Sequence, residues 1–423
     1  MTAFPLLFKF LSILNHKTFN NYNWRCRYEE IYSFSLSYYT RIVNFEVFQT
    51  IRSYLLKIYM GYQNTHFQLE ELFSYISPGL FTIPSVIGFD PLDNIISYDN
   101  ALLAVIRYKD RRYFVSSTAI TDRTTKIYFL IISGENLDEL YSVELANLII
   151  KEAIRNSGYF SKFLRLLYDD FADKISFKLL PKLNLTLNDI YLKDKSELQN
   201  FIEAVKTKSQ VLRYLSVGEP GTGKTDTIRA IISECLKTNG ITVIVVDSSC
   251  KVPLSLVFEY AEIFSPVFLC IDDIDILVGS RNKVFSKHEL SSALEALDGF
   301  ITKEENFLIV TTNDREFVDV VLRRPGRFDF ILEFKELDPE FCPELVFRES
   351  KDELLSEVFK NEIITRKLAN IKATGAFIVT LVKHLLKPRY ENFRYDPQVV
   401  LNLIEKLQKA FKSEMKIEES IGF

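Results

Sequence analysis

An eight-residue segment, Gly218–Thr225, has the residue types and spacing that phosphate binding requires. Its sequence, GEPGTGKT, matches the pattern G-x-x-x-x-G-K-[ST]. The glycines allow the backbone to curl so that successive N–H groups point at phosphate oxygens. Lys224 would place its ammonium group beside the β- and γ-phosphates, and the hydroxyl of Thr225 would ligate Mg²⁺. The segment therefore predicts a phosphate-binding loop for a nucleotide.

The elements predicted on both sides of this loop fit the same function. Val211–Val217 is predicted to be a strand that leads into the loop. Lys224–Leu236 is predicted to be a helix, because apolar residues recur at helical spacing: Ile228, Ile231, Ile232 and Cys235. The N-terminus of such a helix adds its dipole to an anion site. The alternative, a glycine-rich turn that binds nothing, does not explain why the strand, the helix and the Lys-Thr pair occur together.

Two consecutive carboxylates, Asp272 and Asp273, lie at the end of the apolar run Pro266–Asp272, which predicts another strand. An acidic residue at a strand end beside the phosphate loop can hold Mg²⁺ through water. Its neighbour can then orient and deprotonate the attacking water. The alternative is a solvated, Asp-rich loop. Downstream of a complete phosphate loop, the acidic pair favours a site for ATP hydrolysis.

The second half of the chain alternates predicted strands and helices. Further apolar runs predict strands at Ile241–Asp247, Phe307–Thr312 and Phe330–Phe334. Such runs suit a parallel sheet with helices on both faces. A helix is predicted to begin at Ser286, where Glu289 completes a capping box, and the last part of the chain is predicted to be helical. The predicted fold class is α/β, with the parallel sheet of a P-loop NTPase.

The first half of the chain carries no motif with recognisable chemistry. Met1–Leu72 is predicted to be mostly helical, Ile95–Ser133 to form strands with a polar turn at Lys109–Arg111, and Ser142–Tyr168 to be helical. This order predicts a separate α+β domain that ends near residue 178.

Composition narrows the class of protein further. The 423 residues are enough for two or three domains, and the net charge of −4 gives no basic footprint for nucleic acid. Five cysteines without a C-x-x-C pair indicate reduced thiols, so a cytoplasmic location is expected. No stretch of about 18 apolar residues predicts a membrane span, and Ala3–Leu14 is expected to be a buried amphipathic helix. The isolated histidines receive no metal role: His16, His66 and His384.

Five further segments of the second half carry motifs in a characteristic order: Asp189–Tyr191, Leu294–Gly299, Thr311–Asn313, Leu322–Asp329 and Thr374–Ala376. With the phosphate loop and the acidic pair, they make the chain from about Asn188 onward resemble the AAA+ ATPase family, in particular its classic AAA clade. The core resembles that of membrane AAA proteases and of the mitochondrial Rieske-protein translocase.

The resemblance implies roles for individual residues. Asn313 is expected to hydrogen-bond the γ-phosphate or the attacking water, Asp273 to act as the base, and Arg324 and Arg327 to be arginine fingers that reach a neighbouring subunit's ATP. Without the other motifs, the arginines would fit a solvated basic loop equally well. Thr225 and Asp272 are expected at Mg²⁺. The remaining expected nucleotide contacts are Asp189, Ile190, Tyr191, Glu219, Pro220, Gly221, Thr222, Gly223, Lys224, Thr225, Asp226, Gly375 and Ala376.

The resemblance also implies an architecture. Residues 179–341 are expected to form the AAA+ nucleotide-binding domain and residues 342–423 its helical lid. Residues 1–178 are expected to recognise a protein partner or substrate. The implied cofactors are ATP and Mg²⁺, and the implied assembly is a homo-hexameric ring.

Three positions depart from the family pattern. Glu219 replaces a common proline in the phosphate loop, and Asp273 replaces the usual catalytic glutamate, with one methylene fewer. The segment Ser248–Val252 is shorter than usual and lacks the aromatic-glycine pair that lines the ring pore in many members. An active but slow ATPase is therefore expected, and conventional polypeptide threading is not.

Two functions remain open on these grounds: a ring-forming ATPase that remodels protein partners, and a slow ATP-switched assembly or scaffold protein. A metalloprotease is disfavoured, because His288-Glu289 begins H-E-x-x-H but Ser292 stands at the second histidine position. A GTPase is disfavoured because Thr312-Asn313-Asp314 offers no N-K-x-D guanine reader. A clamp-loader role on DNA is disfavoured by the R-P-G-R segment and the mildly acidic chain.

Overall fold

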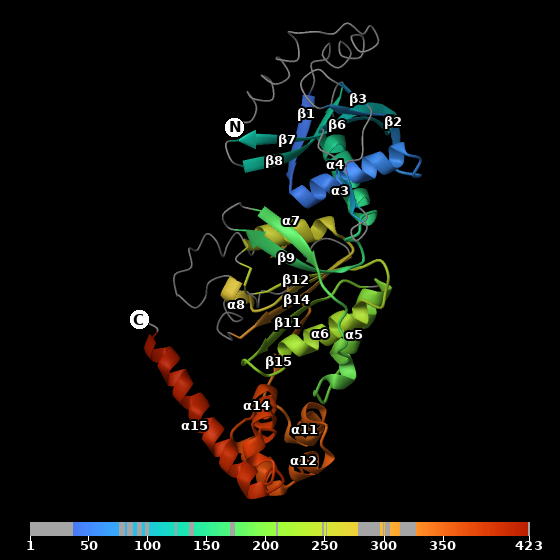
Figure 1. Ribbon diagram of the computed structural model, residues 1–423. Coiled ribbons are helices and arrows are strands. Elements are labelled where there is room, and N and C mark those ends of the chain that lie inside the picture. The colour runs from blue at the N-terminus through green and yellow to red at the C-terminus, as the bar shows by residue number, and fades with distance from the viewer. Residues whose placement is uncertain are drawn as a thin grey trace, which may run out of the picture. The chain divides into compact units, whose positions relative to one another are not determined.

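The computed structural model divides the chain into two compact units (Figure 1). The first comprises Met1–Leu180, Gly240–Ile244 and Cys250–Val267, and the second comprises Pro181–Asn239, Val245–Ser249 and Phe268–Phe423. The structure describes residues 37–75, 81–82, 88–90, 95–97, 101–122, 125–134, 139–169, 174–208, 210–247, 249–250, 252–277, 297–298, 300, 305–313 and 327–421.

The first unit contains an antiparallel sheet with strand order β1-β8-β7-β6-β2-β3. Its strands are β1 (Ser37–Val43), β2 (Gln68–Tyr75), β3 (Phe81–Thr82), β6 (Ala101–Tyr108), β7 (Arg111–Asp122) and β8 (Thr125–Gly134), and a separate pair is formed by β4 (Gly88–Asp90) and β5 (Ile95–Ser97). The β6–β7 turn lies where the polar residues predict it. Lys109 and Asp110 both have left-handed backbones, as a two-residue hairpin turn requires.

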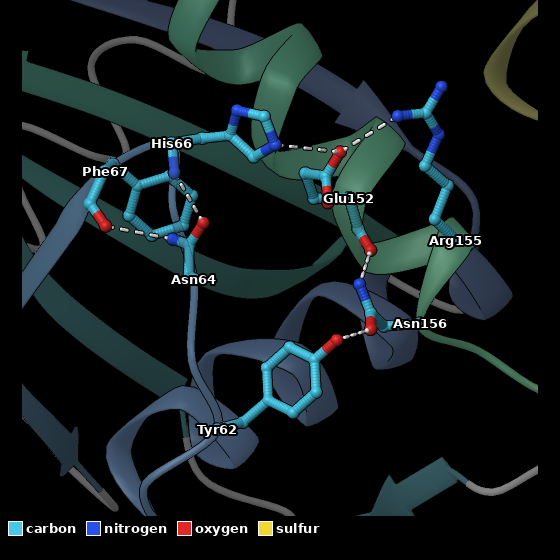
Figure 2. Close-up of polar contacts among 7 residues, drawn as sticks. All are labelled: Tyr62, Asn64, His66, Phe67, Glu152, Arg155 and Asn156. Carbon is cyan, nitrogen blue, oxygen red and sulfur yellow. Dashed lines mark hydrogen bonds and ion pairs between the residues drawn. The ribbon is translucent and has the colours of Figure 1, made fainter.

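Two helices, α3 (Phe45–Tyr59) and α4 (Glu139–Arg155), pack against each other and against this sheet. A polar cluster joins the loop after α3 to the end of α4 (Figure 2). In it, Nε2 of His66 lies 3.7 Å from Oε1 of Glu152, and the hydroxyl of Tyr62 donates to Asn156. His66 thus contacts a carboxylate in a structural cluster.

Two secondary-structure predictions in this unit are wrong. The helix predicted over Ser142–Tyr168 ends at Arg155, and Phe163–Asp169 is the strand β9, paired with β10 (Lys174–Leu179). Met1–Leu72 is predicted to be mostly helical, but its described part, residues 37–72, contains strands β1 and β2 beside the one helix α3. β1 pairs with the distant strand β8, and β9 pairs with the next strand, β10, and with β12 (Thr242–Val246) far along the chain; a local pattern does not show such partners. The unit also contains α7 (Leu254–Ile263), and β10 and β9 continue to β12.

The second unit contains strands in the order β13-β14-β11-β15, in which β11 is parallel to both β14 and β15. Their bounds are Val267–Ile271 for β13, Asn306–Thr312 for β14, Arg213–Gly218 for β11 and Phe330–Phe334 for β15. β14 is buried along its whole length, as a central parallel strand should be. Helices α5 (Ser196–Thr207) and α6 (Lys224–Cys235) lie side by side (Figure 1), and the short α8 (Ile274–Leu277) follows β13.

The end of the chain is helical, as predicted. The helices are α11 (Cys342–Ser350), α12 (Glu353–Val358), α13 (Glu362–Asn370), α14 (Gly375–Leu385) and α15 (Pro397–Ile421), with 3₁₀ turns η4 (Pro339–Phe341) and η5 (Pro388–Tyr390). Asp352, Asn361 and Thr374 cap α12, α13 and α14 with their side chains. These helices share one apolar core around Leu355, Phe359 and Leu381. The predicted fold class is therefore confirmed: a parallel sheet with helices, a helical C-terminal region and an N-terminal α+β part.

None of the helices in the described residues combines the length and the apolar character that crossing a membrane requires.

Candidate nucleotide-binding site

The phosphate loop connects β11 to α6, as the sequence predicts. Gly221 and Gly223 have positive φ angles of 81° and 96°, so the loop uses the backbone freedom of glycine at both positions. Gly218 is needed for a different reason, because a Cβ there would lie 2.4 Å from the carbonyl oxygen of Phe334 on β15. The loop therefore curls tightly at the end of the sheet and leads directly into the N-terminus of α6, where anions are favoured.

Lys224 is the cation at the centre of this site. Its side chain is buried, and Nζ donates to the carbonyl oxygens of Gly218 at 2.7 Å and Glu219 at 3.0 Å, and to Oδ1 of Asn313 at 2.7 Å. Burial lowers the pKa of Lys224, while the carboxylates of Asp273 and Asp272 oppose that shift. The loop and the end of β14 thus hold the ammonium group from two sides.

Asp272 follows β13 and connects the phosphate loop to β14. Its Oδ2 accepts a 3.3 Å hydrogen bond from the Thr225 hydroxyl, and its Oδ1 accepts one of 2.6 Å from Thr311. Hydroxyl and carboxylate oxygens are ligands that Mg²⁺ prefers, and Mg²⁺ beside phosphates needs only one or two such protein ligands. Thr225 and Asp272 therefore fit the predicted cation. The described residues contain no cluster of three or more His, Cys, Asp or Glu arranged for a metal.

Asp273 lies beside Asp272 in an unusual backbone conformation. Its φ angle is +51°, a left-handed value that aspartate tolerates better than most residues. Its N–H donates to the Thr311 hydroxyl at 2.7 Å, and its Oδ1 accepts from Nδ2 of Asn313 at 2.8 Å. Burial, followed by the nearby carboxylates of Asp272 and Asp275, raises the pKa of Asp273. The candidate base and the candidate sensor Asn313 are therefore in direct contact.

A third carboxylate, Asp275, is part of the site although the motifs do not include it. It lies in the first turn of α8 with only 4% of its surface exposed. Its Oδ1 accepts hydrogen bonds from the Thr312 hydroxyl at 2.9 Å and from the backbone N–H of Asn313 at 3.2 Å. The sequence does contain a signal for Asp275, the spacing Asp-Asp-x-Asp directly after an apolar strand. A third acidic residue is unexpected there, because it falls in a helix start that is buried.

The N-terminus of α14 touches the phosphate loop. The Ala376 N–H donates to the Gly221 carbonyl oxygen at 3.1 Å, and a Cβ on Gly221 would lie 2.8 Å from Cβ of Ala376. Thr374 caps the helix by accepting from the Phe377 N–H. The structure thus brings Gly375 and Ala376 to the phosphate loop, 150 residues later in the sequence, as the resemblance implies.

The Asp189–Tyr191 segment lies against α11. Nη1 of Arg348, on α11, donates to the Asp189 carbonyl oxygen at 2.9 Å, and its guanidinium lies 5.2 Å from the centre of the Tyr191 ring. The Asp189 carboxylate accepts from the hydroxyl and N–H of Thr186, which lowers the pKa of Asp189. Ile190 is buried. This segment therefore links the sheet to the helical region.

Other predicted site residues are more dispersed. Asp226 lies on α6 in an exposed ion pair with Arg229, and Pro220 and Glu219 are exposed at the loop. Arg327 forms an ion pair with Asp298. Arg324, the helix start predicted at Ser286, and most of the Leu294–Gly299 motif lie outside the described residues. Of the short segment Ser248–Val252, the structure describes Ser249, Cys250 and Val252.

Comparison with known proteins agrees with this geometry. Residues 214–336 match the model of the family described as "ATPase family associated with various cellular activities (AAA)". This part of the chain, residues 214–336, belongs to the AAA ATPase family. The match covers the Gly218–Thr225 loop, the carboxylates after β13 and Asn313 after β14.

Several curated proteins share this AAA region at a distance. The chain is 30% identical over 160 residues to the ATP-dependent zinc metalloprotease FTSH 7, chloroplastic, of Oryza sativa subsp. japonica, covering 33% of this chain and 19% of the relative. It is 28% identical over 220 residues to the mitochondrial inner membrane i-AAA protease supercomplex subunit YME1 of Saccharomyces cerevisiae, covering 48% and 29%. It is 29% identical over 184 residues to the proteasome-activating nucleotidase of Saccharolobus islandicus, covering 37% and 46%. The chain thus spans less than half the length of each of these relatives.

Among solved structures, one described as "Structural Basis for Katanin Self-Assembly" matches 47% of this chain and 69% of its own chain, with 25% identity and a TM-score of 0.34.

Proposed function

We propose that this AAA-family chain is a Mg²⁺-dependent ATPase that assembles into a homo-hexameric ring and remodels or disassembles protein partners. The observation that carries the proposal is the convergence of five side chains that follow β11, β13 and β14. Lys224 reaches Asn313, Thr225 reaches Asp272, and Asn313 reaches Asp273. Cation, metal ligands, candidate base and candidate sensor are therefore all within one hydrogen-bonded site.

Each group has a place in phosphoryl transfer. The loop N–H groups and Lys224 would bind the phosphates of ATP, and bound Mg²⁺ would neutralise charge on the β- and γ-phosphates. Asn313 would orient the attacking water, and Asp273 would accept its proton. Arg324 and Arg327 are proposed to enter the neighbouring subunit's site, where a guanidinium stabilises charge in the transition state.

The other parts of the chain receive proposed roles as well. Residues 179–341 would be the catalytic domain and residues 342–423 a lid, supported by the Ala376–Gly221 contact. Residues 1–178 would recognise a protein client; their described residues include a six-stranded antiparallel sheet that is separate from the strands leading to the phosphate loop. We propose a cytoplasmic location on the basis of the free cysteines in the described part of the chain.

A second candidate function is a slow, ATP-switched assembly or scaffold protein. The observation that favours it is Asp273 itself. Its side chain is one methylene shorter than that of the usual glutamate, and it already accepts a hydrogen bond from Asn313. A displacement of about 1 Å at a reacting group can slow catalysis by on the order of 10²-fold. The Ser248–Val252 segment, which has no aromatic residue, also favours this alternative over threading.

The proposed function is tested by measuring ATP binding and phosphate release for Lys224→Ala. Loss of the ammonium should abolish or strongly weaken ATP binding, because a charge-assisted contact to phosphate is removed. Lys237→Ala is the matched control, since Lys237 lies at the other end of α6 in an exposed pair with Glu234. Unchanged ATP affinity in Lys224→Ala would refute the assignment of the phosphate loop.

A second experiment tests whether the protein binds a partner and assembles into a ring. An Asp273→Asn variant in ATP should stay bound to its partner, so that a pull-down recovers the client with the ATPase. Mass measurement with and without ATP would report the size of the assembly. A switch or scaffold would turn over slowly in the wild type and would show no gain in partner capture from the Asp273→Asn change.

A further inference from the structure

We propose that Asp275 is a positioning residue of this site: its carboxylate fixes the backbone of Asn313 and thereby directs the Asn313 side chain at both Asp273 and Lys224. This inference rests on the proposed ATPase function and adds a residue that belongs to none of the motifs described above.

The geometry shows how the carboxylate of Asp275 can position Asn313 and, through Asn313, affect Asp273 and Lys224. Asp275 Oδ1 accepts from the Asn313 N–H at 3.2 Å and from the Thr312 hydroxyl at 2.9 Å. The side chain of Asn313 then uses both of its ends. Its Nδ2 donates to Asp273 at 2.8 Å, and its Oδ1 accepts from Lys224 at 2.7 Å. The asparagine can bridge base and cation only if its backbone is held at this point.

The end of β14 is built for this arrangement. Thr311 and Thr312 are consecutive and fully buried, and their hydroxyls donate to different carboxylates. Thr311 donates to Asp272, which faces Thr225, whereas Thr312 donates to Asp275. The carboxylates after β13 therefore have separate duties: Asp272 at the candidate metal position, Asp273 at the candidate base position, and Asp275 beneath the sensor.

Burial explains why the hydrogen bond between Asp275 and Asn313 should restrict the movement of Asn313. Asp275 is 4% exposed, so its charge is largely removed from water and depends on hydrogen-bond donors in the protein. Two of these donors come from the residues that end β14. Moving Asn313 away would therefore leave a buried carboxylate with fewer donors, which is unfavourable, so Asn313 is confined to one orientation.

The test compares Asp275→Ala with Asp275→Asn, which keeps an acceptor oxygen. We expect Asp275→Ala to lower kcat by on the order of 10- to 100-fold with ATP affinity unchanged, because it misplaces Asn313 while Lys224 keeps its contacts with the carbonyl oxygens of Gly218 and Glu219. Asp275→Asn should keep more activity. Thr312→Val should show part of the same loss, and Thr312→Ser, which retains the hydroxyl, should restore it.

Two further measurements separate positioning from a general structural role. In an Asn313→Ala background, Asp275→Ala should cause little additional loss of kcat, because the group through which it acts is already absent. Amide hydrogen exchange of nucleotide-free protein should be faster at Asn313 in Asp275→Ala than in the wild type. This exchange result does not depend on turnover, so it holds even if the wild type proves not to hydrolyse ATP, an outcome that refutes the proposed function alone.

The proposal is overturned by any of three results. The first is that Asp275→Ala lowers kcat equally with and without the Asn313 side chain. The second is that Asp275→Ala weakens ATP binding enough to account for the lower rate. The third is that Asp275→Ala changes neither kcat nor amide hydrogen exchange at Asn313. If Asp275→Ala does not fold, Thr312→Val replaces it in the double-mutant comparison with Asn313→Ala. The same three outcomes then overturn the proposal.

Discussion

The guanidinium of Arg327 forms a two-point ion pair with the carboxylate of Asp298 in the same chain, with Nε 2.8 Å from Oδ1 and Nη2 2.9 Å from Oδ2. Arg327 is buried, whereas Asp298 is half-exposed. Such fork-to-fork geometry fixes the direction of the guanidinium plane. An arginine that acts on a neighbouring subunit would therefore be aimed by Asp298.

The first prediction concerns this pair. Arg327→Ala should bind ATP normally and hydrolyse it poorly, and Asp298→Ala should share the defect because it frees the guanidinium. The double variant should lose little more than either single variant, since the two residues act as a unit. Phosphate release and ATP affinity of the three variants are the measurements.

The control is subunit mixing. Arg327→Ala mixed with Asp273→Asn should regain some activity, because a mixed ring has interfaces where one subunit supplies the base and its neighbour the arginine. Wild-type specific activity should also rise with protein concentration before it levels off. Turnover that is independent of concentration, with no rescue despite proven subunit exchange, would contradict the ring.

The second prediction separates the two acidic residues that follow β13. Asp272→Ala should lose Mg²⁺-dependent hydrolysis, because it removes the carboxylate beside Thr225. Asp273→Asn should keep ATP binding and lose turnover, because an amide does not accept the proton of water. Removing Mg²⁺ with a chelator should reproduce the Asp272→Ala defect in the wild type. Wild-type turnover in Asp273→Asn would show that Asp273 is not the base.

The third prediction concerns Asp273→Glu. The left-handed backbone at this position tolerates aspartate and asparagine, but it costs most other residues about 1–2 kcal/mol. Asp273→Glu should therefore lower the free energy of unfolding by about 1 kcal/mol, whereas Asp273→Asn should leave it nearly unchanged. Denaturant unfolding measures both. Equal stability of the two variants would show that the backbone relaxes at no cost, in which case the longer side chain should raise turnover.

The fourth prediction uses two glycines of the phosphate loop that share a positive φ. A Cβ on Gly221 would lie 2.8 Å from Cβ of Ala376, whereas a Cβ on Gly223 would meet nothing within 4 Å. Both changes to alanine should destabilise through the backbone. Gly221→Ala should in addition displace the start of α14 and so lower the thermal midpoint further. Hydrogen exchange at Ala376 should increase in Gly221→Ala only, and an increase of the same size in Gly223→Ala would contradict the contact.

The sequence by itself determined the phosphate loop, because all of its chemistry lies within eight consecutive residues. The turn at Lys109 and Asp110 and the strands beside the site were predictable for the same reason, since turns and apolar runs act over a few neighbouring residues. The resemblance extended this to separated motifs such as Thr311–Asn313.

Only the tertiary structure decided how distant residues pair. Asp275 acquires its partners from a strand 37 residues later, and Lys224 meets Asn313 across 89 residues. The Arg327–Asp298 pair also lies beyond any local pattern, and the helix predicted over Ser142–Tyr168 was wrong because Phe163–Asp169 is a strand hydrogen-bonded to β12, far along the chain. In each case the deciding interaction is a hydrogen bond or ion pair between distant segments. Its free energy depends on burial and on the partner's position, and neither is encoded in the spacing of neighbouring residues.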